Sequence, residues 1–331
     1  MISARLSAAA STKARLGVLK DALGLEAEEA VKDEGLIPAM MALLTDEDAR
    51  VRQSALDALG QLQHRSVIAF PAALSPTIRR RALDDAPEVR AECAVALALL
   101  PPDDAAEVTR CLNNLLRDAD PRVRREAAAA LGDLGDRAQV ITLEPLLEDP
   151  DDGVRFEACF ALASLGSKTS LPLLIGALET PHLLDACEAL RRLGDPSAAP
   201  ALKKAAGRFF LGWPEKLTLL AAAASLGDVE AGQALVGRTK ALLREERALA
   251  IALLGASKVS AARGPLEAIA LDPKNPLREG AIYALSELGL GESRPCLERL
   301  MGDADTGVAA AAKEALERLR DRERQISAAS A

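Results

Sequence analysis

Apolar residues recur along this chain three and four positions apart, which is the spacing of a helix that buries one face. Residues 118–135 illustrate the pattern, because one face of this stretch holds Val123, Ala127, Ala130, Leu131 and Leu134. Asp120 and Pro121 precede the periodic residues and Gly135 follows them. These are the residue types that begin and end helices, so the segment is predicted to be a capped amphipathic helix.

The same pattern occurs nine times. Three copies are clear, at residues 46–62, 118–135 and 149–166. Fainter copies occupy residues 84–100, 180–194, 213–227, 244–255, 272–289 and 303–319. The equivalent positions run from Val51 to Val308 in eight steps, or about 32 residues per repeat. A repeat of this length accommodates two helices.

The composition agrees with stacked helices. Hydrophobic residues make up 49% of the sequence, but aromatic residues make up only 2%. One large core needs aromatic rings to fill its volume, whereas thin layers of closely spaced helices need Ala, Leu and Val. The longest apolar stretch, Leu217 to Leu226, is shorter than the roughly 20 residues of a membrane-spanning helix. No membrane segment is therefore predicted.

At this level of detail the repeats resemble HEAT repeats, in particular the short bacterial type of phycobilin-lyase-like proteins, over about residues 35–320. The resemblance implies an all-α fold, a right-handed α-solenoid of about nine to ten helix pairs in which each second helix lines the concave face. We expect residues 1–34 to cap the solenoid, residues 35–320 to form a single domain with irregular repeats over about 177–255, and residues 321–331 to form a fraying tail.

An acid stands six residues before an arginine in five of the repeats. The pairs are Asp46 and Arg52, Asp84 and Arg90, Asp118 and Arg124, Asp149 and Arg155, and Asp272 and Arg278. In HEAT proteins such residues form a ladder between adjacent repeats, so the resemblance gives them a structural role. In the middle repeats Ala177, Phe210 and Arg238 occupy the acid position, and Leu183, Lys216 and Arg244 occupy the arginine position. The ladder is therefore expected to lapse there.

The residues that would support catalysis are scarce. His64, expected in a turn, and His182 are the only histidines, and neither precedes a glutamate, unlike the iron-binding His-Glu pairs of the HEAT enzyme deoxyhypusine hydroxylase. The five cysteines are widely separated, and Cys159 and Cys187 lie beside core alanines, so we interpret them as packing residues. Residues 149–153 and 303–307 imitate calcium loops but lack the closing glutamate. No catalytic residue, metal or cofactor is predicted.

Acidic residues recur at one exposed position of the second helices. The row reads Ser54, Glu92, Glu126, Glu157, Asp185, Thr218, Glu246, Gly280 and Ala311. The whole chain has 41 Lys and Arg against 49 Asp and Glu, a net charge of −8. Acidity of this kind disfavours nucleic acid and anionic lipid surfaces and suits a basic segment of a partner protein. The alternative is that the row is only a solvated helix face.

Five of the seven aromatic residues lie between residues 156 and 213. Phe156 and Phe160 are one helical turn apart at positions expected to be exposed, and we interpret them as anchors for a partner protein. Phe209, Phe210 and Trp213 lie where the ladder lapses. They fit either an anchor site or a core filling in an irregular joint.

The leading hypothesis is a cytoplasmic, non-catalytic scaffold or adaptor that binds a partner protein along the concave groove. Its contacts would be Phe156 and Phe160 with the acidic row, and also Trp213. One alternative is a subunit of a phycobilin-lyase-like enzyme that handles a chromophore, and another is a nucleic-acid-binding HEAT protein. The first 20 residues carry basic but no acidic side chains, which fits a capping helix or a transit peptide.

Overall fold

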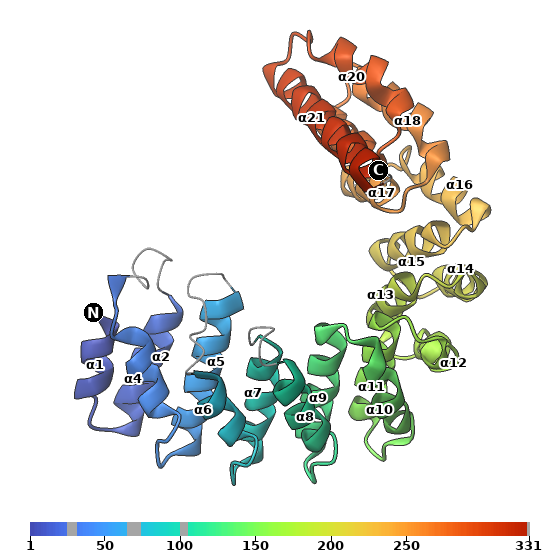
Figure 1. Ribbon diagram of the computed structural model, residues 1–331. Coiled ribbons are helices and arrows are strands. Elements are labelled where there is room, and N and C mark those ends of the chain that lie inside the picture. The colour runs from blue at the N-terminus through green and yellow to red at the C-terminus, as the bar shows by residue number, and fades with distance from the viewer. Residues whose placement is uncertain (25–31, 65–73, 100–104, 330–331) are drawn as a thin grey trace. The chain divides into compact units, whose positions relative to one another are not determined.

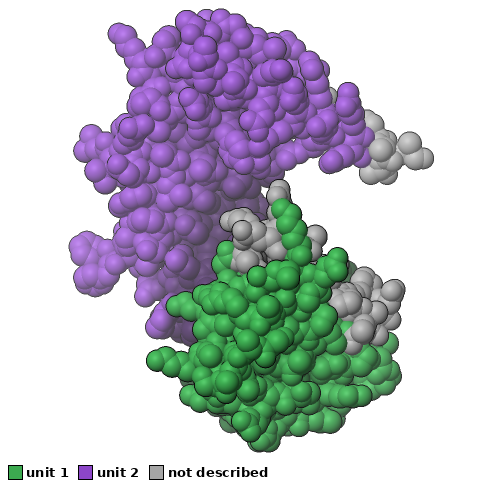
Figure 2. Space-filling model, turned by 90° about the vertical axis from the view of Figure 1, so that its left-hand side faces the viewer, with its two compact units in different colours: residues 1–170 green, residues 171–331 purple. Residues whose placement is uncertain are grey.

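The computed structural model describes residues 1–24, 32–64, 74–99 and 105–329, and within these ranges the regular secondary structure is helical (Figure 1). Contacts divide the chain into two compact units, residues 1–170 and residues 171–331, coloured separately in Figure 2. Each unit consists of helix pairs in two layers. We call the first helix of each pair the A helix and the second the B helix.

In unit 1 the B helices contact one another in sequence, and each is covered by its own A helix. The B helices are α2 (Thr12–Leu23), α5 (Ala49–His64), α7 (Pro87–Ala98), α9 (Pro121–Leu134) and α11 (Asp152–Ser164). The A helices are α1 (Ile2–Ala8), α4 (Leu36–Leu43), α6 (Leu74–Arg81), α8 (Ala105–Leu115) and the short pair α10 (Val140–Leu143) and η3 (Glu144–Glu148). His64, expected in a turn, is the last residue of α5.

Unit 2 follows the same plan. Its B helices are α13 (Leu183–Leu193), α15 (Trp213–Ser225), α17 (Arg244–Ala256), α19 (Arg278–Leu288) and α21 (Thr306–Ala329). Its A helices are α12 (Leu171–Ala177), α14 (Ala199–Ala206), α16 (Val229–Arg238), α18 (Arg263–Leu271) and α20 (Arg294–Leu300). The described residues thus form an all-α solenoid of ten helix pairs, as the sequence predicts.

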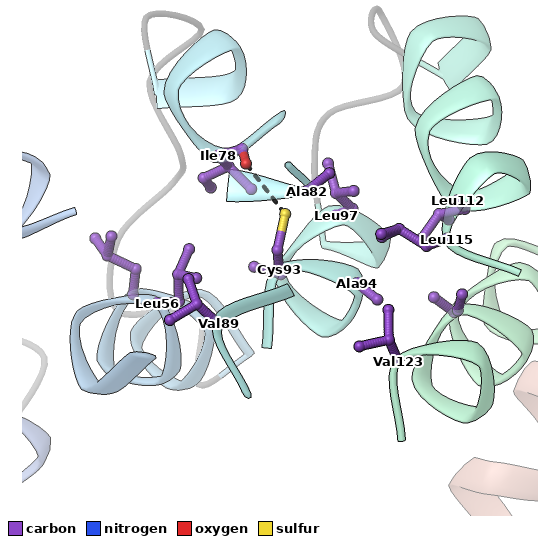
Figure 3. Close-up of a cluster of buried hydrophobic side chains, with 14 of the residues drawn as sticks. Leu56, Ile78, Ala82, Val89, Cys93, Ala94, Leu97, Leu112, Leu115 and Val123 are labelled. Carbon is purple, nitrogen blue, oxygen red and sulfur yellow. Dashed lines mark hydrogen bonds between the residues drawn. The ribbon is translucent and has the colours of Figure 1, made fainter. Parts of the chain in front are cut away.

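The core between the layers is thin and aliphatic. Figure 3 shows its centre in unit 1, where side chains from five successive helices meet, among them Leu56 of α5, Ile78 of α6 and Leu112 of α8. The thiol of Cys93 is buried among them and donates to the carbonyl oxygen of Ile78 at 3.1 Å. Small and medium side chains suffice because each layer is only one helix deep. This explains how the chain folds with so few aromatic residues.

Glycine at the end of the repeated Leu-Gly pattern lets B helices approach closely. A Cβ atom on Gly132 of α9 would lie 2.8 Å from the Cα of Ala161 on α11. A Cβ atom on Gly255 of α17 would lie equally close to Ala284 of α19. Real Cβ atoms do not approach another carbon so closely, so these two positions require glycine.

Both ends of the chain pack on their neighbours. At the N-terminus α1 contacts α4 and α2 contacts α5, while part of the expected cap, residues 25–31, lies outside the described residues. At the C-terminus α21 continues as far as Ala329, so the segment expected to form a tail is helical over its described residues. The guanidinium of Arg322 donates to the carbonyl oxygen of Glu287 at 3.2 Å and so ties this segment to α19.

Candidate functional site

The acid and arginine of each regular repeat form contacts along and between repeats. Arg52, at the start of α5, donates from Nη1 to the carbonyl oxygen of Asp46 at 2.8 Å. Its Nε donates to the carboxylate of Asp84, in the next repeat, at 2.8 Å. Arg52 and Asp84 are both buried. Burial by itself would raise the pKa of Asp84, but the hydrogen bonds from the Arg52 guanidinium and the backbone N–H of Ala86 together hold this pKa below its usual value. The pair thus joins two repeats at their edge.

Similar ion pairs join further repeats. Arg90 bonds Asp118 at 2.7 Å, Arg124 bonds Asp149 at 2.8 Å, and Arg278 pairs with Asp303. Arg15 extends the series to the N-terminal cap by donating to Asp46 at 2.6 Å. The sequence argument missed Arg15, although it precedes Asp46 by the usual repeat length.

The series stops at Arg155. This residue keeps the bond to its own repeat, donating to the carbonyl oxygen of Asp149 at 2.6 Å, but its ion pair is with Asp152 of its own helix. The position where a ladder acid is expected in the next repeat is Ala177. In unit 2, Asp272 accepts a hydrogen bond from the backbone N–H of Lys274, two residues along.

One predicted register is wrong. Arg247, rather than Arg244, donates to the carbonyl oxygens six and five residues earlier, those of Ala241 and Leu242, as the ladder arginines do. The repeat is therefore shifted by three residues, and Glu246 occupies the position that valine holds elsewhere. Glu246 is only 8% exposed and accepts from Arg238 at 3.2 Å. It is not part of an exposed acidic row.

An acidic hollow opens on the B helices of unit 1, over α5, α7 and α9. We use this name for a cavity of about 340 Å³ whose lining is mostly apolar but includes four carboxylates. We call these carboxylates, Asp57, Glu92, Glu126 and Asp133, the rim, and we call the lining residues Gly60, Val95, Ala98, Leu99 and Ala129 the floor. The sequence singled out Glu92 and Glu126 as contact residues, but not Asp57 and Asp133. Asp133 lies seven residues after Glu126, so the helical spacing alone places both on the same helix face.

The rim does not carry its full charge at neutral pH. Partial burial raises the pKa of Glu92 to about 7, and repulsion by Asp57 and Glu126 adds to the effect. A hydrogen bond from Gln53 opposes the shift. Glu126 accepts a hydrogen bond from the guanidinium of Arg125 at 2.7 Å. The hollow is therefore an acidic site whose charge increases as the pH passes through about 7.

The other predicted acids lie elsewhere. Glu157 is half-buried on α11 and does not line the hollow. Asp185 is exposed on α13 in unit 2, 3.8 Å from the ring nitrogen of His182. Of the acids in the predicted row, Glu92 and Glu126 line the hollow, whereas Glu157 and Asp185 do not and Glu246 is buried.

The aromatic residues divide differently from the expectation. Phe156 and Phe160 are half-buried on α11 with ring centroids 6.3 Å apart, so the prediction that they are exposed is wrong. Trp213 is also half-buried and packs against the apolar core of unit 2. Phe209 and Phe210, in contrast, are 87% and 97% exposed. Their rings contact each other edge to face, with centroids 5.2 Å apart.

Burial also determines the state of the thiols. It raises the pKa of Cys159 to about 11 and that of Cys187 to about 12, so both are protonated at neutral pH. Protonated thiols are poor nucleophiles.

In the described part of the chain, no three or more His, Cys, Asp or Glu side chains are grouped so that they could hold a metal ion. No helix among the described residues is long and apolar enough to cross a membrane.

Some solved structures have a similar arrangement. An engineered protein is 20% identical with a TM-score of 0.46, and the match covers 96% of this chain and 98% of that one. The complex of CpcE and CpcF of phycocyanin lyase from Nostoc sp. PCC7120 is 23% identical with a TM-score of 0.42, covering 86% and 94%. Human deoxyhypusine hydroxylase in complex with glycerol is 20% identical with a TM-score of 0.34, covering 88% and 99%. Values this low carry no argument about function.

A comparison with curated protein sequences found no match. Family models gave a clear result, however. The model for HEAT repeats matches residues 72–158, 141–208 and 234–317, and a second HEAT repeat model matches residues 36–65. These matches cover well over half of the chain and coincide with its helix pairs, so the protein belongs to the HEAT-repeat family.

Proposed function

We propose that this protein is a non-catalytic scaffold that binds a basic segment of a partner protein in the acidic hollow. The observation that carries the proposal is the hollow itself, which four carboxylates line together with apolar residues. A segment that alternates Lys or Arg with aliphatic side chains complements both features. Its cations would pair with the rim, and its apolar side chains would cover Val95 and Leu99.

The electrostatics support a cationic ligand. Glu92 and Glu126 repel each other in the free protein, and this repulsion adds to the high pKa of Glu92. A bound cation would relieve the repulsion and favour the ionised form of Glu92. Binding should therefore be tighter at pH 8 than at pH 6 and should release a proton near pH 7. Added salt should weaken it, because the rim is open to solvent.

Titration calorimetry with a synthetic peptide of alternating Arg and Leu tests the proposal on the full chain. We expect binding at pH 8 in low salt, and no binding of a peptide in which Glu replaces each Arg. Glu126→Gln should weaken binding by about 1 kcal/mol or more, because a charge-assisted contact is lost. Glu92→Gln should weaken it at pH 8 and have little effect at pH 6, where Glu92 is already protonated.

Glu148→Gln is the matched control, because Glu148 is exposed on η3 and does not line the hollow. It should bind the peptide like the wild type. The proposal fails if the basic peptide does not bind at pH 8. It also fails if Glu148→Gln weakens binding as much as Glu126→Gln, because the attraction would then come from overall charge rather than from the hollow.

A further inference from the structure

Large apolar side chains gather at one edge of unit 2. Phe209 and Phe210 lie just before α15, and Leu242 and Leu243 lie just before α17. Leu242 is 98% exposed and Leu243 is 52% exposed. α15 and α17 are neighbouring B helices that contact each other. Successive B helices of a helix-pair solenoid run in the same direction, so we infer that the segments leading into them lie at the same edge. We call these four residues the apolar edge.

The fold does not require this edge to be apolar. In the regular repeats of unit 1, the equivalent segment carries the ladder acid, which is largely buried against an arginine of the preceding repeat. Phe210 stands at that acid position. Its ring contacts that of Phe209 and is otherwise left in water. An exposed apolar patch of this kind marks an interaction surface.

Cationic residues flank the apolar edge in the sequence. Residues 207–216 and 238–247 contain six Lys and Arg against three Glu. Arg208, Lys240 and Arg244 are exposed beside the apolar residues. Unit 2 as a whole contains 21 Lys and Arg and 21 Asp and Glu, so the net charge of −8 belongs to unit 1. The repulsion of anionic surfaces inferred from the total charge therefore does not apply to unit 2.

We propose that the apolar edge docks unit 2 on an anionic lipid membrane. Aromatic and leucine side chains at the tips of two loops can enter the headgroup layer one by one, because a fluid layer needs no complementary shape. The long Lys and Arg side chains beside them would stay at headgroup level and pair with anionic lipids. This surface is separate from the acidic hollow, which lies in unit 1.

Trp213 provides a signal at the proposed contact. It is the only tryptophan of the chain and lies three residues after Phe210. The full chain is mixed with vesicles of phosphatidylcholine alone or of phosphatidylcholine with phosphatidylglycerol. We expect co-sedimentation and a blue shift of the Trp213 emission with the phosphatidylglycerol vesicles in low salt. Phosphatidylcholine alone should bind more weakly by about tenfold, and high salt should remove the difference.

Two variants separate the apolar and cationic contributions. Phe209→Ser with Phe210→Ser should reduce vesicle binding by roughly tenfold or more. Lys240→Gln with Arg244→Gln should reduce it by about tenfold on phosphatidylglycerol vesicles only. Leu83→Ser and Lys313→Gln are the controls. Leu83 is an isolated exposed leucine in unit 1, Lys313 is exposed within helix α21 of unit 2, and both variants should bind normally.

All these side chains are exposed, so circular dichroism should show an unchanged helical fold for each variant. The proposal is overturned if the wild type does not bind phosphatidylglycerol vesicles in low salt. It is also overturned if the double Phe variant binds them like the wild type. If the wild type ignores vesicles but self-associates in a way that the double Phe variant abolishes, the edge is a protein interface and the lipid proposal is wrong.

Discussion

At the scale of single residues, Lys258 occupies a position that other repeats give to glycine. It lies 31 residues after Gly227 and 31 before Gly289, and all three have positive φ. The φ of Lys258 is 56°, in the left-handed region that costs a residue with a Cβ about 1 kcal/mol or more. The side chain compensates in part, because its ammonium group bonds the carbonyl oxygen of Glu287.

Lys258→Gly should therefore raise the free energy of unfolding by about 1 kcal/mol, because relief of the strained backbone outweighs the loss of one exposed hydrogen bond. Urea unfolding measures the change. Lys258→Ala is the control, since it loses the same hydrogen bond and keeps the strain, and it should be no more stable than the wild type. A glycine variant less stable than the alanine variant would show that the backbone strain is not significant.

Glu92 links pH to stability in the acidic hollow. Its pKa rises from 4.5 in the unfolded chain to about 7 in the folded protein. The folded state therefore holds the Glu92 proton more tightly than the unfolded chain does. The stability that this proton contributes to the folded state is fully present below pH 4.5 and is lost as the pH rises through about 7. At pH 8, Glu92→Gln should be more stable than the wild type by about 1–2 kcal/mol and should therefore unfold at a higher temperature. The gain is limited to this size because the Glu92 carboxylate is partly solvated.

The difference between Glu92→Gln and the wild type should shrink towards pH 4.5, where both side chains are neutral. Thermal unfolding at the two pH values measures it. Glu148→Gln, at an exposed position, should show no such pH dependence. An equal difference at both pH values would mean that Glu92 is not neutral in the folded protein at pH 4.5 to 7.

The sequence locates the residues of the hollow only where the repeats keep one register. Glu92 and Glu126 were found because the spacing between their repeats is regular and their helices pack side by side. Glu246 was misplaced because the loop before α17 shifts the register by three residues, which periodicity alone does not reveal. Phe156 and Phe160 were misjudged because their burial depends on how neighbouring side chains fill the surface of α11, which no spacing rule contains.

At the scale of helices, the ladder offers a comparison between two arginines of equivalent position. Arg124 bonds its own repeat and also Asp149 of the next repeat. Among the described residues, Arg155 bonds its own repeat and pairs with Asp152 in the same helix. Both side chains begin a B helix, so the contact between repeats is the main difference between them.

Arg124→Ala should lower the free energy of unfolding by about 2–3 kcal/mol, because it leaves the nearly buried Asp149 carboxylate without its partner. Arg155→Ala should cost about 1 kcal/mol, since its lost ion pair is solvent-exposed. Urea unfolding at pH 7 compares the two. The Arg124 guanidinium lowers the pKa of Asp149, so the contribution of this pair should vanish as the pH falls below about 3.8. Equal costs for the two variants would contradict a stabilising ladder.

The helices themselves were the most predictable feature. Asp120 and Pro121 begin α9 and Gly135 ends it in the left-handed conformation, as the residue types indicate. Each such signal is local, so it is visible in one repeat. The contact of Arg322 with α19 could not be predicted, because a contact over that sequence distance leaves no local signal.

At the scale of the whole molecule, the described residues form separate apolar cores. The core of unit 1 extends from Ile2 to Leu165, and a second core in unit 2 extends from Leu217 to Leu319. In the described ranges, the ladder pairs likewise end at Asp149 and resume at Arg278. In a repeat protein each repeat is stabilised by its neighbours, so an interruption of this kind weakens cooperation between the two sides. The sequence, in contrast, predicts a single domain over 35–320.

Urea unfolding followed by two probes distinguishes these views. Trp213 packs against the core of unit 2, so its fluorescence reports that unit, whereas circular dichroism reports all helices. We expect two transitions, because the cores are separate. Arg124→Ala should shift the circular dichroism curve only, and Leu285→Ala, which empties a fully buried site on α19, should shift the fluorescence curve by about 3 kcal/mol. If both probes instead follow one transition that each variant shifts equally, the repeats unfold as one domain, because coincident curves require cooperation across the interruption.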